Sequence, residues 1–188
     1  MGRWEPNARG RLEQAALELF VERGFEQTTV AEIAQRAGLT ERTFFRHFTD
    51  KREVLFAGGS TLQELLVNAV AQAPDDAAPL DAVADALQTV APHLQQRGDY
   101  PRQRQSVIAA NPELQERELI KLAGLATAMA AALRDRGVPE PAASLAAEAG
   151  IAVFRVAFER WTVEDCRPDL AELMRDSLAQ LRAVTAGR

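Results

Sequence analysis

Apolar residues recur every three or four positions along most of the chain, and no stretch sustains an alternation of apolar and polar residues. The first spacing is that of one face of an α-helix, whereas the second would indicate a β-strand. Alanine, the residue with the highest helix propensity, occurs 35 times among the 188 residues. We therefore expect an all-α protein of about nine helices, separated by breaks at glycine and proline.

The expected helices follow from this spacing and from their start signals. Thr29 and Thr40 are expected to cap the second and third helices, because a threonine side chain can accept a hydrogen bond from an otherwise unpaired backbone N–H group. A long fourth helix is expected from the cap Asp50 to about Ala73, with Gly58-Gly59 inside it. The other helices are expected at about 8–23, 30–37, 41–48, 80–96, 102–110, 112–136, 141–164 and 169–186.

The segment Val30–Phe48 predicts a helix-turn-helix. Ala34 is small enough to let a second helix cross closely, and Gly38 stands at the turn, where a positive φ favours glycine. Phe44 follows on the second helix and can fill the space between the two helices. A small residue, a glycine and a hydrophobic residue at these spacings are typical of a helix-turn-helix, whose second helix enters the major groove of DNA.

The outward face of that second helix carries side chains that suit contacts with DNA. Arg42 can donate to guanine, Glu41 can accept from cytosine, and Phe45 can pack against a thymine methyl group. Thr43, His47 and Lys51 are expected near phosphates. For Arg42 and Arg46 the alternative is a solvated helix face without DNA contacts. For His47 the alternative is an imidazole that caps the helix or is exposed to solvent. The candidate DNA-binding residues are Thr29, Thr40, Glu41, Arg42, Thr43, Phe45, Arg46, His47 and Lys51.

Charge is unevenly distributed along the chain. The formal net charge is −5, but residues 1–52 carry nine Lys/Arg and eight Asp/Glu, a net of +1, which leaves −6 for the rest. The excess of +2 in Thr40–Arg52 is modest, so we expect DNA affinity to need two copies of the motif. Arg3, Arg9 and Arg11 are interpreted either as a basic arm that reaches the DNA or as a frayed terminus.

A longer pattern surrounds the helix-turn-helix. It consists of Ala15-Ala16, Leu19-Phe20, Gly24-Phe25, Thr28-Thr29-Val30, Ile33-Ala34, Ala37-Gly38-Leu39-Thr40, Thr43-Phe44-Phe45, His47-Phe48 and Lys51. With this pattern, residues 8–55 resemble the N-terminal domain of TetR/AcrR-family transcriptional regulators. Two positions depart from it: Arg42 stands where many relatives have a small residue, and Phe45 where many have tyrosine. The DNA sequence that this helix reads therefore cannot be copied from well-known members.

The resemblance implies a helix-turn-helix DNA-binding domain at residues 1–52 and a helical ligand-binding and dimerisation domain at residues 53–188. It implies a bacterial, cytoplasmic, homodimeric repressor that binds a pseudo-palindromic double-stranded DNA operator and an unidentified small-molecule effector. Activation instead of repression is the alternative, since the residues do not encode the position of the operator in a promoter.

The last two helices are expected to form the homodimer interface, because residues 141–164 are apolar nearly all round. Among helices 53–164 we expect a mostly apolar ligand pocket. Gly58-Gly59 are interpreted either as a hinge or as a site of close packing, and for Arg155 an ion pair with Glu159 is favoured over contact with a ligand anion. The candidate ligand-binding residues are Leu62, Leu66, Gln103, Arg104, Met129, Phe154, Arg155, Phe158, Glu159 and Trp161.

No combination of residues indicates catalysis. His47 and His93 lie in different segments, and no cluster of His, Cys and carboxylates has the spacing of metal ligands. Cys166 is the single cysteine, which excludes an intrachain disulfide. We therefore expect no enzyme activity, no metal, no cofactor and no membrane contact. A small all-helical enzyme or binding protein with an incidental helix-turn-helix is the alternative class.

Overall fold

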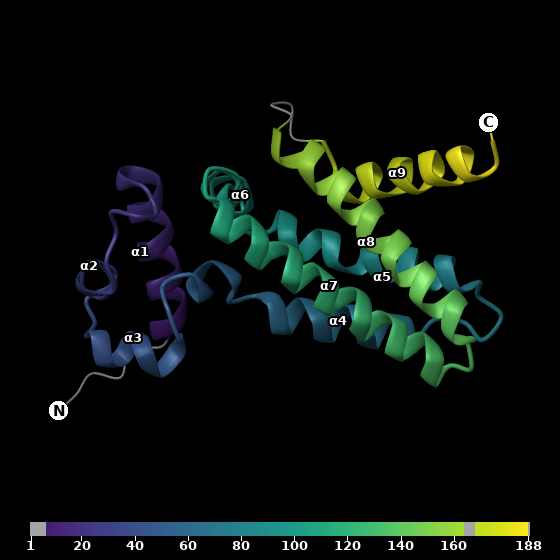
Figure 1. Ribbon diagram of the computed structural model, residues 1–188, viewed down its shortest axis with the longest axis horizontal. Helices are drawn as coiled ribbons and strands as arrows, with labels where there is room; N and C mark the ends of the chain where they lie inside the picture. Colours follow the sequence, from purple (N-terminus) through teal and green to yellow (C-terminus); the bar gives the residue numbers. More distant parts are fainter. Residues whose placement is uncertain (1–6, 164–167, 188) are drawn as a thin grey trace. The chain divides into compact units, whose positions relative to one another are not determined.

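The computed structural model describes residues 7–163 and 168–187, and all regular structure in these two ranges is helical (Figure 1). The prediction of an all-α fold is confirmed, with nine α-helices and one short 3₁₀-helix, η1, over these ranges. In chain order the elements are α1 (Ala8–Arg23), α2 (Val30–Arg36), α3 (Glu41–His47), η1 (Glu53–Phe56), α4 (Gly59–Ala71), α5 (Pro79–Gln95), α6 (Tyr100–Ala109), α7 (Pro112–Asp135), α8 (Glu140–Val163) and α9 (Leu170–Thr185).

Local sequence signals set the ends of α2 and α3. The Thr29 hydroxyl accepts a hydrogen bond from the Glu32 N–H, and the Glu32 carboxylate accepts one from the Thr29 N–H, which completes a capping box. The Thr40 hydroxyl accepts from the Thr43 N–H and caps α3. Gly38, with a φ of 66°, follows α2 in the left-handed region that favours glycine. Both predicted caps are therefore confirmed.

The prediction of one long fourth helix is wrong. After Asp50 the chain forms η1, then a turn at residues 57 and 58, and α4 begins only at Gly59. A glycine costs a helix interior about 1 kcal/mol relative to alanine, so two glycines in succession favour a break. A Cβ atom added to Gly59 would meet no neighbouring element within 4 Å, so close packing does not explain this glycine.

The described residues divide into two compact units. The first comprises residues up to Gly58 together with residues 103–118, and the second comprises residues 59–102 together with those from Leu119 onward. The first unit thus extends beyond residue 52, and it takes in most of α6 and the start of α7. Both of these helices pass from one unit into the other without a break in their helical structure.

The core of the first unit surrounds Phe44 of α3, which is completely buried. Its ring centroid lies 5.4 Å from that of Phe48, and Leu12 of α1 and Ile33 of α2 are also completely buried. Burial of one such side chain contributes about 1.5–3 kcal/mol. These contacts anchor one face of α3 against α1 and α2 and leave its other face to solvent.

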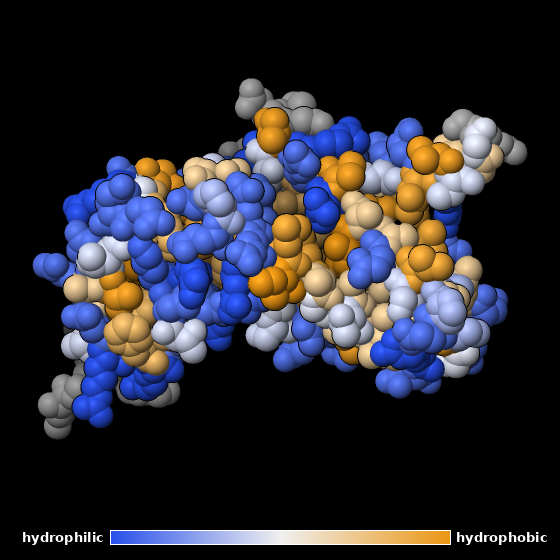
Figure 2. All heavy atoms as spheres, in the orientation of Figure 1, coloured by the Kyte–Doolittle hydropathy of each residue, from blue (hydrophilic) through white to orange (hydrophobic). Residues whose placement is uncertain are grey.

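Helix α8 is apolar on its exposed side as well as on its buried side. Leu145, Val156 and Val163 are 71%, 53% and 75% exposed, and Figure 2 shows hydrophobic residues at the surface along the course of α8. By length and composition alone, α8 and the segment Glu53–Ala71 could each cross a membrane. However, α8 packs against α5 and α9, and the other segment is interrupted at residues 57 and 58. Packing against two neighbouring helices is typical of a core helix, and the interruption leaves α4 with 13 residues.

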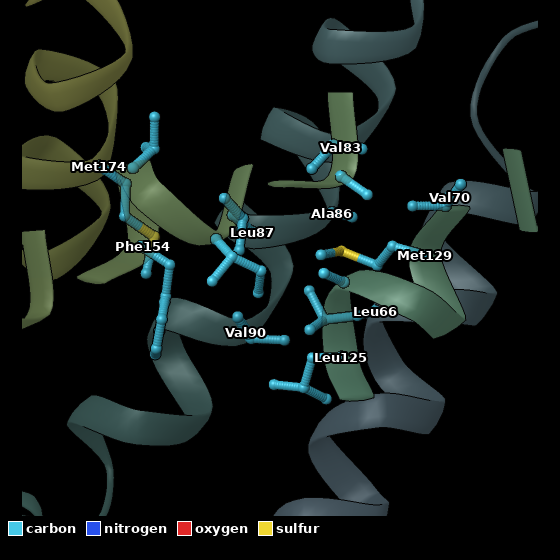
Figure 3. Packing of buried hydrophobic residues seen from close by; sticks show 14 of the residues in the cluster. Leu66, Val70, Val83, Ala86, Leu87, Val90, Leu125, Met129, Phe154 and Met174 are labelled. Carbon is cyan, nitrogen blue, oxygen red and sulfur yellow. The ribbon is translucent and has the colours of Figure 1, made fainter. Parts of the chain in front are cut away.

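The core of the second unit is centred on α5, which packs against α4, α8 and α9. Leu66 of α4, Leu87 of α5 and Met129 of α7 meet in this core (Figure 3). Gly150 of α8 faces Val83 of α5, and a Cβ atom added there would lie 2.2 Å from Val83 Cγ1. The absence of a side chain at residue 150 therefore allows α8 to approach α5 this closely.

Candidate nucleic-acid interface

The helix pair α2–α3 is joined by a tight turn with its own hydrogen bonds. The Gly38 N–H donates to the Gln35 carbonyl oxygen at 3.0 Å, and the Leu39 N–H donates to the Ala34 carbonyl oxygen at 2.8 Å. These bonds satisfy the last carbonyl groups of α2 and fix the direction in which the chain enters α3. Because Phe44 is buried beneath the pair, α3 can present only its opposite face to a partner.

That opposite face consists of Glu41, Arg42, Phe45 and Arg46, all of which are exposed. Phe45 is 55% exposed, although its ring also contacts that of Phe44, with the centroids 5.5 Å apart. This division of α3 into a buried and an outward face was predicted from the sequence, and the burial of its residues agrees with that prediction. Contact of these residues with DNA stays a prediction.

The arginines of α3 differ from the other arginines of the first unit. Among the described residues, neither Arg42 nor Arg46 forms a hydrogen bond or an ion pair, and no carboxylate neutralises them. Elsewhere in this unit arginines are paired with nearby carboxylates, in the pairs Arg9–Glu13, Arg23–Glu32, Arg36–Glu22, Arg52–Asp50, Arg104–Glu118 and Arg117–Glu53. The uncompensated positive charge on α3 is therefore concentrated on its outward face.

These pairings shift the titration of three carboxylates. The hydrogen bond from the Arg36 guanidinium lowers the pKa of Glu22, and the hydrogen bond from the Arg52 guanidinium lowers the pKa of Asp50. In Glu32 the backbone N–H of Thr29 lowers the pKa, because the capping box stabilises the ionised carboxylate. The lowered pKa values mean that these three carboxylates stay ionised to a lower pH than free side chains would.

The remaining candidate residues on α2 and α3 have local structural contacts. The hydroxyls of Thr29 and Thr40 cap their helices, and the Thr43 Oγ1 atom lies 3.1 Å from the Thr40 Oγ1 atom. His47 is half-buried near the Phe48 ring, and its Nε2 atom is buried without a hydrogen-bond partner among the described residues. These residues stay candidates for phosphate contacts.

The Lys51 side chain forms hydrogen bonds with backbone carbonyl groups of the same unit. Its Nζ atom donates to the carbonyl oxygens of Phe25, Thr28 and Glu26 at 2.8, 3.3 and 3.4 Å, and it lies 4.2 Å from the centroid of the Phe25 ring. The ammonium group thus holds the loop between α1 and α2. No spacing in the sequence indicates this contact, because its partners lie 23 to 26 residues away.

Arg9 is likewise engaged within the first unit. Its guanidinium donates to the Ala57 carbonyl oxygen, lies 3.4 Å from the Glu13 carboxylate and lies 5.6 Å from the centroid of the Phe48 ring. Arg9 therefore links the first turn of α1 to the segment after η1. Arg3, the other end of the proposed basic arm, lies outside the described residues, as does Cys166.

The structure separates the candidate ligand-binding residues into two groups. Leu62, Leu66, Met129, Phe154, Phe158 and Trp161 belong to the second unit, and all of them belong to its apolar core or pack against it. Phe158 lies between the other two rings of α8, 5.4 Å from Phe154 and 5.6 Å from Trp161 between centroids. Arg155 and Glu159 are exposed, and the described contacts include no ion pair between them.

Gln103 and Arg104 belong instead to the first unit. The Arg104 Nε atom donates to the Leu55 carbonyl oxygen at 2.7 Å, and its Nη1 atom donates to the Glu118 carboxylate at 2.9 Å. These contacts were not predicted from the sequence, and neither was the pairing of Arg117 with Glu53. A role of Gln103 or Arg104 in ligand binding stays a prediction.

Two family models match this chain. Residues 13–57 match the model described as bacterial regulatory proteins of the tetR family, and residues 77–186 match the model of the MftR C-terminal domain. The first match covers the whole of the helix-turn-helix, and the second covers more than half of the chain.

Individual relatives agree with these matches. The transcriptional regulator TcmR of Streptomyces glaucescens is 40% identical over 82 residues, which are 44% of this chain and 36% of TcmR. MftR of Mycobacterium tuberculosis, a regulator provisionally assigned to mycofactocin biosynthesis, is 32% identical over 129 residues, which are 66% of this chain and 63% of MftR. The chain thus aligns with about a third of TcmR and with less than two thirds of MftR.

A solved structure matches over almost the whole length. FadR of Thermus thermophilus, a TetR family transcriptional repressor in complex with lauroyl-CoA, is 26% identical with a TM-score of 0.56, and the match covers 92% of each chain. Together with the α2–turn–α3 geometry, these findings define a helix-turn-helix DNA-binding protein. The chain belongs to the TetR family of bacterial regulatory proteins.

Proposed function

We propose that the protein is a ligand-responsive, homodimeric transcriptional repressor that acts on a pseudo-palindromic operator in the bacterial cytoplasm. The observation that carries the proposal is the outward face of α3, where Phe45 is exposed beside Arg42 and Arg46, two arginines without a partner among the described residues. An exposed aromatic ring is unfavourable in water, and together with the two unpaired cations it complements the phosphates and base edges of a DNA groove.

The chemistry of each side chain suggests its role in the groove. The Arg42 guanidinium can donate two hydrogen bonds to guanine O6 and N7, and the Glu41 carboxylate can accept from cytosine N4. Phe45 can pack on a thymine methyl group or a sugar, and Arg46 can contact a phosphate or a base edge. Thr40, Thr43 and His47 lie beside this face and are proposed as phosphate contacts.

The proposal is tested by selecting duplexes from a random DNA pool with the purified protein and sequencing them. A two-fold dimer should enrich inverted half-sites whose centres are about 34 Å apart or a multiple of that distance. The double variant Arg42→Ala/Arg46→Ala should enrich no sequence. The control Arg23→Ala, which removes an exposed arginine already paired with Glu32, should enrich the wild-type sequence. A wild-type protein that enriches nothing would overturn the proposal.

The homodimer is proposed to form through α8 and α9. The three exposed hydrophobic residues of α8, Leu145, Val156 and Val163, are spaced by 11 and 7 residues, which places them on one stripe of the helix. Such a stripe is costly to leave in water, and the small residues Ala149 and Ala152 lie on it. A second copy of α8 is the partner that a two-fold axis supplies.

The effector is proposed to be hydrophobic or amphipathic. No charged side chain of the described part of the second unit is buried, and its core consists of aliphatic and aromatic residues. A charged group placed in such a core would lack a counterion, so the buried part of a ligand has to be neutral. The complex of the relative FadR with lauroyl-CoA supports a ligand with an apolar chain.

The effector proposal is tested with lauroyl-CoA and with neutral aromatic compounds as probes. We expect at least one probe to raise the melting temperature of the protein and to release the selected duplex in a fluorescence anisotropy titration. A probe that raises the melting temperature without releasing DNA would argue against a regulatory ligand of that class. A reporter gene placed behind the selected operator distinguishes repression from activation.

A further inference from the structure

Four charged side chains of the first unit form a cluster around η1. The Arg104 guanidinium of α6 donates to the Glu118 carboxylate of α7 at 2.9 Å, and the Arg117 Nε atom of α7 donates to the Glu53 carboxylate of η1 at 2.7 Å. The side chains of Arg104, Glu118 and Glu53 are 18%, 21% and 19% exposed. The Arg104–Glu118 pair is therefore less screened by solvent than the surface pairs of α1 and α2, whereas in the other pair Glu53 is the less exposed partner and Arg117 is 38% exposed.

The same cluster holds the backbone of η1. The Arg104 Nε atom donates to the Leu55 carbonyl oxygen at 2.7 Å, and its guanidinium lies 4.9 Å from the centroid of the Phe56 ring. Val54, Leu55 and Phe56 are buried, and η1 packs against α1. The cluster thus attaches α6 and α7 to η1, the segment that follows α3 in the chain and packs against α1.

Helices α6 and α7 are the continuous connections between the two compact units among the described residues. The connection at residues 57 and 58 is a turn, whereas α7 is helical from Pro112 in the first unit to Asp135 in the second. A hydrogen-bonded helix keeps its length when one end is displaced, and a turn does not. Met129 of α7 is completely buried in the second core, about 16 Å along the helix from Glu118 at 1.5 Å per residue.

We propose that the pairs Arg104–Glu118 and Arg117–Glu53 are the positioning residues that couple the effector site of the second unit to the DNA-binding face of the first, through α7 and η1. This inference rests on the proposed function and deepens it. A ligand that displaces the core around Leu66 and Met129 moves α7, and the paired charges carry this movement to η1 and α1. This coupling through α7 and η1 does not require one continuous helix from Asp50 to about Ala73, which the sequence predicted and the structure lacks.

The coupling is measurable without the effector, because linkage between two sites is reciprocal. Hydrogen–deuterium exchange is recorded for the full-length protein with and without the selected duplex. In the wild type, the duplex should slow exchange in the first unit and also in residues 119–135 of α7, the latter by about fivefold or more. In Glu118→Gln and Glu53→Gln, which replace a carboxylate by an amide of the same shape, the slowing in residues 119–135 should disappear.

The matched control is Glu140→Gln. The Arg134–Glu140 pair joins the other end of α7 to α8, within the second unit, at 2.6 Å. Glu140→Gln removes one negative charge, and with it an ion pair of α7, outside the proposed path, so the wild-type exchange pattern should persist. The swap Glu53→Arg/Arg117→Glu, which restores an ion pair with opposite polarity, should recover at least part of the effect.

The outcomes separate this inference from the proposed function. A wild-type chain that selects no duplex overturns both. A chain that binds its duplex without slowing exchange in residues 119–135, or whose Glu118→Gln and Glu53→Gln variants keep that slowing, overturns the coupling alone. If the variants of the carboxylates do not fold, Arg117→Gln removes the Glu53 pair from its more exposed side and is judged by the same readout.

Discussion

The Lys51 Nζ atom donates a 2.8 Å hydrogen bond to the carbonyl oxygen of Phe25, 26 residues earlier in the chain. It also donates to the carbonyl oxygens of Glu26 and Thr28. The loop between α1 and α2 thus depends on a side chain that follows α3 in the chain. The ammonium group supplies these backbone carbonyl oxygens with the hydrogen-bond donor that they would otherwise receive in a helix or a sheet.

We expect Lys51→Met to destabilise the protein by about 1.5–3 kcal/mol, because it removes a charge-assisted hydrogen bond and leaves partly buried carbonyl oxygens without a donor. Urea unfolding monitored by circular dichroism measures this loss. The control is Arg42→Met, which removes an exposed cation without a hydrogen bond or ion pair among the described residues and should stay within about 0.5 kcal/mol. If Lys51 instead contacts a phosphate, stability should be unchanged and the slope of log Kd against log salt should fall by about one.

Arg42→Ala should relax sequence preference at one or two base pairs of each half-site. The expected loss is about 1–3 kcal/mol for each bidentate contact with guanine. The measurement compares dissociation constants for the selected operator and for its single-base variants, at one fixed salt concentration. Unchanged discrimination between these duplexes would remove Arg42 from the residues that read bases, even if the overall affinity fell.

The helices and the outward face of α3 could be predicted from the sequence because their causes are local. Helix spacing, the threonine caps at 29 and 40, and the glycine at the turn act over a few residues, and the structure places most helix ends close to the predicted ones. The alternation of buried Phe44 and exposed Phe45 likewise follows from helix geometry.

Features that depend on distant residues could not be predicted. The contacts of Lys51 and Arg104 join segments 26 and 49 residues apart, and no periodicity relates their partners. At Gly58-Gly59 two local signals conflicted: the apolar spacing favoured a continuous helix and the glycines favoured a break. The ion pair expected between Arg155 and Glu159 is absent from the described contacts, although both side chains are exposed and stand four residues apart on α8.

Val156→Arg should convert the proposed dimer to a monomer. Val156 is 53% exposed at the centre of the α8 stripe, where a two-fold axis would bring two introduced charges together. Sedimentation equilibrium gives the mass directly, and operator affinity should fall because one recognition helix would act alone. The matched control is Asn68→Arg, which adds the same charge at an exposed position of α4. A Val156→Arg protein that keeps the mass of a dimer would place the interface elsewhere.

Gly150→Ala should destabilise the second unit by about 1–3 kcal/mol, the usual cost of an added methyl group in a packed core. The new Cβ atom would lie 2.2 Å from Val83 Cγ1, so α5 and α8 would have to separate. Val83→Ala removes the colliding methyl group, and the double variant should be more stable than the sum of the two single effects predicts. Gly59→Ala, whose Cβ atom would meet open space at the first residue of α4, is the control and should be neutral or stabilising. Additive losses in the urea unfolding of the double variant would show that Val83 does not set the distance between α5 and α8.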